Sequence, residues 1–139
     1  MKILMAIDGS ANALRALRFV LRHPMVDDRT AITLIQVDAP LNGHIASFLD
    51  ASAIERYHER NSADALRGAR RVLRQTNRTY DELTRVGDAA EVIAKTAARG
   101  RFDMIAMGSH GRGALGTALL GSVVQKVLAR SKLPVLVVR

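Results

Sequence analysis

The sequence predicts a single α/β domain built on an open, five-stranded parallel sheet with helices on both faces. Five short apolar segments alternate along the chain with four helical patterns, which is the order typical of parallel strands joined by right-handed crossovers. The first and last segments are nearly continuous apolar runs, and such runs indicate strands buried on both faces. A length of 139 residues suits one domain, so we assign residues 1–139 to one unit.

Each element follows from a local pattern. The expected strands are Ile3–Ile7, Ala31–Val37, Tyr80–Val86, Phe102–Met107 and Leu133–Val138. Ser10 has the side chain of a helix N-cap, so the first helix is expected between Ser10 and His23–Pro24. The other helices are expected at about Ala51–Gln75, Ala89–Arg99 and Ser122–Arg130. Residues 38–50 form the longest irregular stretch, where we expect a mobile loop.

Composition excludes several classes of protein. The chain has no Cys, which rules out disulfides, thiolate nucleophiles and Cys-ligated metal centres. Its apolar stretches are far shorter than the ~20 residues of a membrane-spanning helix, and Ile3–Ile7 is too short for the core of a signal peptide. We therefore expect a cytoplasmic protein without a membrane partner.

The charge balance favours an anionic partner. The net charge is +8, with 21 Lys and Arg against 13 Asp and Glu. The second expected helix and the segment after it contain Arg56, Arg60, Arg67, Arg70, Arg71, Arg74 and Arg78. We favour a solvated outer helix face for these arginines, and the alternative is a surface for nucleic acid or another acidic partner. No motif for sequence-specific nucleic-acid recognition accompanies them, and aromatic residues make up only 4% of the chain.

A glycine-rich segment is the strongest candidate for a binding site. Five of the ten glycines lie between Gly108 and Gly121, after the fourth strand and before the fourth helix. Backbone N–H groups of such a loop, together with a helix N-terminus, bind anions. No Asp or Glu follows Asp103, so an anion would meet no carboxylate from this part of the chain.

Two familiar phosphate-binding motifs do not fit this segment. Residues 111–116 match G-x-G-x-x-G, but no acidic residue follows to hold the ribose of a dinucleotide. Residues 116–122 resemble G-x-x-x-x-G-K-[ST] without the lysine that contacts the phosphates. The sequence thus argues against both a nicotinamide enzyme and a Walker-type NTPase.

Asp8 is a second candidate because it follows the first strand. With a strand order of 3-2-1-4-5, the first and fourth strands flank the switch point, where open parallel sheets bind ligands. Asp8 would then face the same crevice as the glycine-rich segment. Its carboxylate either contacts a ribose or a metal there, or it caps the first helix.

These residues together resemble the universal stress protein family, and the resemblance extends over nearly the whole chain. It depends on Ile7–Ser10, on Gly87–Asp88 and on the closing Lys132–Val138. Its most specific part is G-x2-G-x9-G-[ST], met by Gly108, Gly111, Gly121 and Ser122, which marks the ATP-binding branch of the family. The resemblance implies a Rossmann-like fold and contact of Val37 with adenine. It also implies dimerisation through the last strand, here Leu133–Val138.

We therefore expect an ATP-binding sensor or regulator of the stress response that hydrolyses ATP slowly or not at all. The alternative is a basic interaction module that uses the arginine-rich helix without a nucleotide. A Ser109–His110 hydrolase is not expected, because neighbours in sequence rarely point at each other. Mg²⁺ or Mn²⁺ carried by the phosphates would lie near Asp8. The candidate cofactor-binding residues are Asp8, Gly9, Ser10, Val37, Met107, Gly108, Ser109, His110, Gly111, Arg112, Gly113, Gly121, Ser122 and Val123.

Overall fold

The predicted fold class is confirmed. The computed structural model describes residues 1–112 and 120–139, which form a parallel sheet of order β3-β2-β1-β4-β5. The strands are β1 (Lys2–Ala6), β2 (Ala31–Asp38), β3 (Asp81–Val86), β4 (Met104–Gly108) and β5 (Val135–Val138). The helices are α1 (Ala11–Arg22), α2 (Gly43–Ala46), α3 (Ala51–Arg74), α4 (Ala89–Arg99) and α5 (Ser122–Arg130).

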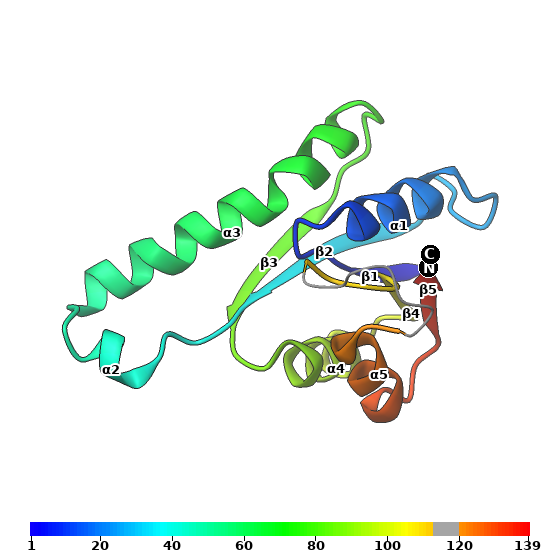
Figure 1. The fold of residues 1–139 in the computed structure, drawn as a ribbon. Coiled ribbons are helices and arrows are strands. Elements are labelled where there is room, and N and C mark those ends of the chain that lie inside the picture. The colour runs from blue at the N-terminus through cyan, green and yellow to red at the C-terminus, as the bar shows by residue number, and fades with distance from the viewer. Residues whose placement is uncertain (113–119) are drawn as a thin grey trace.

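Alternating side chains of the central strands fill two separate cores. Ile3 and Met5 of β1 belong to the core under α1 and α3, whereas Leu4 and Ala6 belong to the core under α4 and α5. Figure 1 shows these two helix pairs on opposite faces of the sheet. The near-continuous apolar sequence of β1 is therefore explained by burial on both faces.

Three of the predicted helices, α1, α3 and α4, begin where the sequence predicts because a side chain caps each of them. Ser10 accepts a hydrogen bond from the Ala13 N–H at 3.1 Å, and Asp50 and Asp88 cap α3 and α4 in the same way. Such caps satisfy N–H groups that have no partner within the helix. α4 and α5 span the expected residues, and α1 ends at Arg22 before His23.

The irregular stretch at residues 38–50 differs from the expectation of a loop. It contains the one-turn helix α2, capped by Asn42. In Figure 1, α2 and the adjoining end of α3 project beyond the sheet. This projection exposes Ile45, Phe48 and Tyr57. A segment of four residues is too short to show the hydrophobic periodicity from which a helix is predicted.

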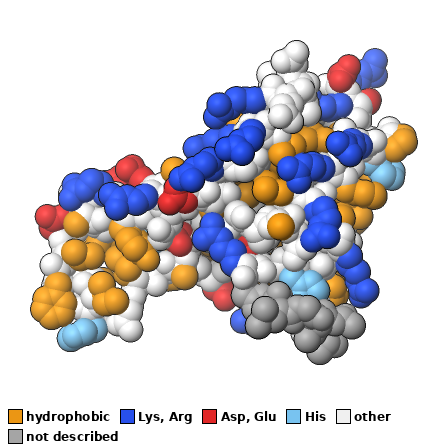
Figure 2. All heavy atoms as spheres, turned by 45° about the horizontal axis from the view of Figure 1, so that its top comes forward, with side chains coloured by type: hydrophobic (Ala, Val, Ile, Leu, Met, Phe, Trp, Pro, Cys, Tyr) orange, Lys and Arg blue, Asp and Glu red, His pale blue; other side chains and the backbone are white. Residues whose placement is uncertain are grey.

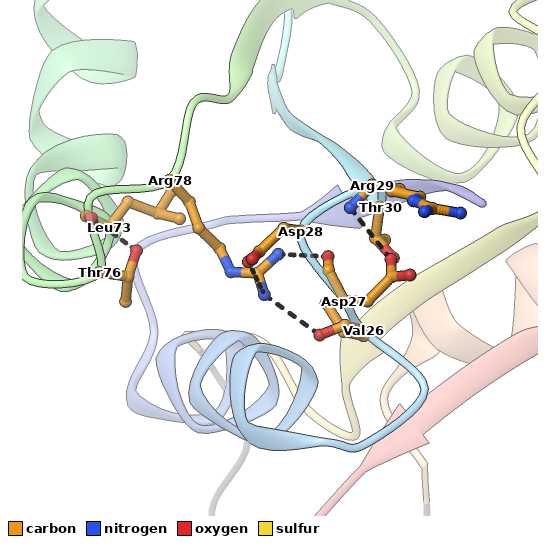
Figure 3. Close-up of polar contacts among 8 residues, drawn as sticks. All are labelled: Val26, Asp27, Asp28, Arg29, Thr30, Leu73, Thr76 and Arg78. Atoms are coloured by element: carbon orange, nitrogen blue, oxygen red, sulfur yellow. Dashed lines mark hydrogen bonds and ion pairs between the residues drawn. The ribbon is translucent and has the colours of Figure 1, made fainter.

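Arg78 joins two connections at the end of the sheet opposite the glycine-rich segment (Figure 3). Its guanidinium donates to the backbone oxygens of Asp27 at 2.7 Å and Val26 at 3.1 Å, and it lies 3.5 Å from the Asp28 carboxylate. Asp27 in turn accepts from the Thr30 hydroxyl at 2.9 Å. These bonds hold the segment after α3 against the segment before β2.

Arg70 of α3 forms an ion pair with Glu82 of β3, with donor–acceptor distances of 2.9 and 2.7 Å. The Arg70 hydrogen bonds, and then its charge, hold the pKa of Glu82 below its ordinary value of 4.5. A lowered pKa in the folded state means that the pair stabilises the fold above the unfolded-state pKa, and that this stability is lost as the pH falls through the folded-state pKa.

We therefore expect Arg70→Gln to lower the free energy of unfolding at pH 7 by about 1 kcal/mol, the upper end of the range for surface ion pairs, because this pair is partly buried. The difference from the parent should shrink as the pH is lowered below the ordinary range of a carboxylate. Urea denaturation at pH 7 and at acidic pH measures both values. A difference that is constant with pH would show that Arg70 acts through packing alone.

Candidate functional site

A cleft lies at the carboxyl ends of β1, β2 and β4. Its volume is about 490 Å³, within the range of small-molecule sites. Asp8 follows β1, Val37 lies near the end of β2, and Gly108 ends β4; all three line the cleft. For the described part of the glycine-rich segment, Gly108, Gly111 and Gly121 line the same cleft as Asp8, as predicted.

One end of the cleft is apolar. Ile35 and Val37 lie two residues apart on β2, so they share one face of the sheet. Ala89 and Ile93 lie four residues apart on α4, so they share one face of that helix. These two pairs form a slot lined by aliphatic side chains, which suits a flat, apolar part of a ligand.

A bonding network holds the end of β2 beside this slot. Asp38 follows Val37, and its Oδ2 lies 2.6 Å from His58 Nδ1 and 2.9 Å from Asn61 Nδ2. Next to it, the buried Gln36 accepts a hydrogen bond from the Ser62 hydroxyl at 2.7 Å. All three partners belong to α3, which therefore fixes the position of Val37 from the opposite side of the sheet.

The other end of the cleft is polar. Asp8 Oδ1 accepts a hydrogen bond from the Ser10 N–H at 2.9 Å, and its Oδ2 would lie 2.9 Å from a Cβ placed on Gly111. The Arg112 guanidinium lies over Gly9, where a Cβ would come within 2.4 Å of Nη2. Gly9 also has a φ of +83°, a conformation that favours glycine. Asp8 thus both shapes the turn before α1 and faces the cleft.

The N-terminus of α5 faces the cleft, and no side chain of the described residues caps it. Gly121 is the N-cap and supplies no side-chain hydrogen bond, and the first turn contains no acidic residue. Ser122, Val123 and Val124 of that turn line the cleft. Within the described residues, the Ser122 hydroxyl makes no hydrogen bond. Free N–H groups at a helix N-terminus attract an anion.

Ser109 and His110 differ from the expectation. The Ser109 hydroxyl lies 2.9 Å from His110 Nδ1, so the two neighbours do point at each other, because the chain turns sharply as it leaves β4. Ser109 is only 2% exposed and does not line the cleft, whereas His110 does. A buried hydroxyl cannot reach a substrate as a nucleophile, so the pair does not create a hydrolase site.

Gly108 is small because of packing within the protein. A Cβ at this position would lie 2.6 Å from the Asn12 carbonyl carbon and 2.8 Å from the Ala13 nitrogen. The start of α1 thus sits directly against the end of β4. Gly121 is also confined, since a Cβ there would meet His110 Cα and the Ser109 oxygen at 3.3 Å. Packing within the protein therefore favours glycine at positions 108 and 121 of the motif, whether or not a ligand binds.

The structure brings together most of the predicted residues. Those that line the cleft are Asp8, Val37, Met107, Gly108, His110, Gly111, Arg112, Gly121, Ser122 and Val123. Gly9, Ser10 and Ser109 lie beside the cleft without lining it, and Gly113 lies outside the described residues. Sequence reasoning missed Ala6, Ile7, Ala13, Ile35, Ala89, Ile93 and Val124. Ile35 could have been found from the two-residue period of a strand that contains Val37.

Comparison with known proteins decides the family. A model of the universal stress protein family matches residues 1–139. The chain belongs to the universal stress protein family. A universal stress protein of Thermus aquaticus is 34% identical over 137 residues, which cover 99% of this chain and 97% of the relative. The stress response protein NhaX of Bacillus subtilis is 29% identical, with the same coverage of both chains.

Solved structures have the same fold. The protein MJ0577 superposes on this universal stress protein with a TM-score of 0.82 at 28% identity, covering 99% of this chain and 94% of that one. A universal stress protein in complex with cAMP has the same fold, with a TM-score of 0.71 at 22% identity over 100% of this chain and 97% of that one.

Among the residues that the structure describes, no group of three or more His, Asp or Glu side chains is arranged to hold a metal ion, so a cation at Asp8 would need ligands from elsewhere. None of the helices that the structure describes is both long and apolar enough to cross a membrane.

Proposed function

We propose that this universal stress protein binds an adenine nucleotide, with ATP as the expected form, and acts as a regulator whose state reports nucleotide occupancy. The observation that carries the proposal is a cleft with an aliphatic slot at one end and a helix N-terminus at the other. An adenine base suits the slot, and phosphates suit the N–H groups.

Each part of the nucleotide has candidate partners. The base would lie between Val37 of β2 and Ile93 of α4, and the ribose beside the Asp8 carboxylate. The phosphates would meet Ser122, the first N–H groups of α5 and the Arg112 guanidinium. A divalent cation would be held by the phosphates, with Asp8 as its protein ligand. The motif Gly108, Gly111, Gly121 and Ser122, which marks the ATP-binding branch, supports this placement.

Structures of the same fold add support of a general kind. One universal stress protein is described in complex with cAMP, one from Arabidopsis thaliana with AMP, and one from Archaeoglobus fulgidus with dAMP. The shared element of these three ligands is an adenosine or deoxyadenosine monophosphate. We therefore place the adenine base and the first phosphate at the core of the proposal.

Fast ATP hydrolysis is not part of the proposal. Asp8 is the only carboxylate among the described residues that line the cleft, and one of its oxygens already accepts the Ser10 N–H. Asp103 lies at the other end of the sheet, where its carboxylate accepts a hydrogen bond from the Lys2 backbone N–H at 2.6 Å. Phosphoryl transfer to water needs a positioned nucleophile, and we assign Asp8 to the ribose or a cation rather than to a water molecule.

The direct test is to purify the protein, denature it and identify released nucleotides by absorbance and chromatography. Calorimetric titration of the nucleotide-free protein with ATP, ADP, AMP and GTP then measures the preference for base and phosphate number. We expect binding of adenine nucleotides and little phosphate release with Mg²⁺ or Mn²⁺. Absence of binding to any of the four would overturn the proposal.

The Ser122 hydroxyl should make a modest contribution to binding. We expect Ser122→Ala to weaken ATP binding by about 0.5–1.5 kcal/mol, the range of one hydrogen bond, or by up to about 3 kcal/mol if the partner is a charged phosphate oxygen. The backbone N–H groups remain in place. The fold should be unaffected, since the Ser122 hydroxyl makes no hydrogen bond within the described residues. Calorimetry on both proteins measures the difference, and equal affinities would remove Ser122 from the site.

We also propose that the protein dimerises through β5. This strand lies at the edge of the sheet and is apolar, Val135–Val138. Ile105 and Ser109 donate to the oxygens of Pro134 and Val138, so Pro134, Leu136 and Val138 direct their backbone groups toward β4. The N–H groups of Val135 and Val137 therefore point outward and can pair with a second copy across a two-fold axis.

Light scattering at tens of micromolar should give the mass of a dimer for the parent. Val137→Pro removes an outward N–H without touching the bonds to β4, and should give a monomer. Val137→Ala is the matched control and should stay dimeric. A monomeric parent, or a dimer that survives Val137→Pro, would contradict this mode of assembly.

A further inference from the structure

Two helices on one side of the molecule present a basic surface apart from the cleft. We call it the arginine face, and it consists of Arg15, Arg18 and Arg22 of α1 with Arg67, Arg71 and Arg74 of α3. All six side chains are exposed. Figure 2 shows Lys and Arg side chains along the surface over these helices. Neither α1 nor residues 66–74 of α3 contains an Asp or Glu.

The two helices bring their arginines together. α1 and α3 run in the same direction over one face of the sheet, and a Cβ on Gly68 would touch the Leu14 side chain at 2.8 Å. Arg18 follows Leu14 by four residues and Arg71 follows Gly68 by three. They therefore lie on the same side of the two helices, one turn beyond the contact. Arg22 and Arg74 lie one further turn along.

This charge is largely uncompensated. Arg67 pairs with Asp64, and Arg15 donates to the Asn12 side chain. Within the described residues, Arg18, Arg22, Arg71 and Arg74 make no ion pair or side-chain hydrogen bond. On the opposite side of the sheet, cations do have acidic neighbours. Lys95 pairs with Glu91, and the pKa of Asp88 is lowered first by the Glu91 N–H and then by the charges of Lys126 and Arg130.

Such an arrangement destabilises the helices that carry it. Arg18 and Arg22 are four residues apart, as are Arg67 and Arg71, and like charges at this spacing repel each other. Within the described residues, no ion pair of Arg18, Arg22 or Arg71 offsets this repulsion. Positions that break a local rule without a structural gain are typical of functional surfaces.

We propose that the arginine face binds the phosphate backbone of double-stranded nucleic acid without reading its sequence. Guanidinium groups match phosphate oxygens with two parallel hydrogen bonds, and two rows with one-turn steps suit a regular array of phosphates. A single strand would need aromatic side chains for base stacking. The exposed aromatic side chain of α1 is Phe19. Its ring packs against the ring of His23, with centroids 5.3 Å apart.

The test is fluorescence anisotropy of a labelled 30-base-pair duplex, titrated with the full chain at several salt concentrations. Contacts from about five arginines predict a slope near −4.5 for log affinity against log salt, and hence about a 500-fold loss between 50 and 200 mM salt. A scrambled duplex should bind equally well. Addition of saturating ATP should leave the affinity unchanged, because the cleft is a separate site.

Two double variants with the same change in charge locate the contact. Arg18→Gln/Arg71→Gln removes one arginine from each helix of the face and should lower the salt slope by about 2, with at least a tenfold loss of affinity at 50 mM salt. Arg99→Gln/Lys126→Gln removes two cations from α4 and α5 and should bind like the parent. Circular dichroism of both variants verifies that the exposed substitutions leave the fold intact.

Several results would overturn the proposal. Equal loss in both variants would show attraction by net charge rather than by this face. Displacement of the duplex by ATP would place the anion in the cleft. No binding at 50 mM salt, or binding of phosphatidylserine vesicles in place of the duplex, would exclude a nucleic-acid partner. Sequence-selective binding that survives physiological salt would contradict recognition through the backbone alone.

Discussion

Val37→Trp should reduce the affinity for ATP by about 100-fold or more, which corresponds to about 2.7 kcal/mol. Val37 lies at the apolar end of the cleft, opposite Ile93. An indole ring at this position occupies the space that we assign to the adenine base. The lost binding comes from exclusion of the base, because the phosphate partners Ser122 and Arg112 are unchanged. Calorimetric titration of both proteins with ATP measures the effect.

Val86→Trp is the matched control for this substitution. Val86 ends β3, the strand next to β2, and pairs with Asp38 in the sheet. It is 46% exposed and does not line the cleft. The same change of residue there should leave both stability and ATP affinity close to the parent values. If Val37→Trp binds ATP as tightly as Val86→Trp does, the base does not lie between β2 and α4.

Most of the fold could be predicted because local and global signals agree in this chain. Asp50 and Asp88 stand immediately before helices that they cap in the structure. The apolar run of β1 is continuous because both of its faces are buried. β4 begins at Met104, later than the predicted Phe102, because Phe102 is buried under α4 and α5 rather than paired in the sheet.

The polar half of the cleft could also be predicted, because its residues follow strand ends and precede a helix. In its apolar half, Val37 was predicted but the α4 side could not be, since Ala89 and Ile93 look like ordinary core residues of a helix in the sequence. They reach the cleft only because α4 packs beside the end of β2. A sequence pattern predicts which face of a helix is buried. It does not predict which residues of that face line a cleft instead of the core.

The arginine face is a second feature that the sequence alone does not predict. The run of arginines in α3 is visible in the sequence, and Arg70 belongs to that run. In the structure Arg70 turns to Glu82 instead, while α1 adds Arg18 beside Arg71. Parallel helices on one face of the sheet create a joint surface that neither helix shows alone. Its partner and the nucleotide would therefore bind at different places on the same domain.

Gly108→Ala should lower the free energy of unfolding by about 3 kcal/mol, even in the absence of a nucleotide. The new Cβ would lie within 2.8 Å of backbone atoms of Asn12 and Ala13. Backbone cannot rotate away as a flexible side chain can, so α1 would have to move off β4. The shift would also disturb the turn at Asp8, which leads into α1. Urea denaturation of the nucleotide-free protein measures the loss.

The control is Gly43→Ala in α2, where a Cβ would meet no atom within 4 Å. Its free energy of unfolding should stay within about 0.5 kcal/mol of the parent value, because the position is exposed and Ala favours a helix over Gly. The comparison separates two reasons for a glycine at position 108. If Gly108 were small only to let a ligand approach, Gly108→Ala would match Gly43→Ala in stability and lose ATP binding alone. A loss of stability without nucleotide, which we expect, shows that the first glycine of the motif is required by the contact between β4 and α1.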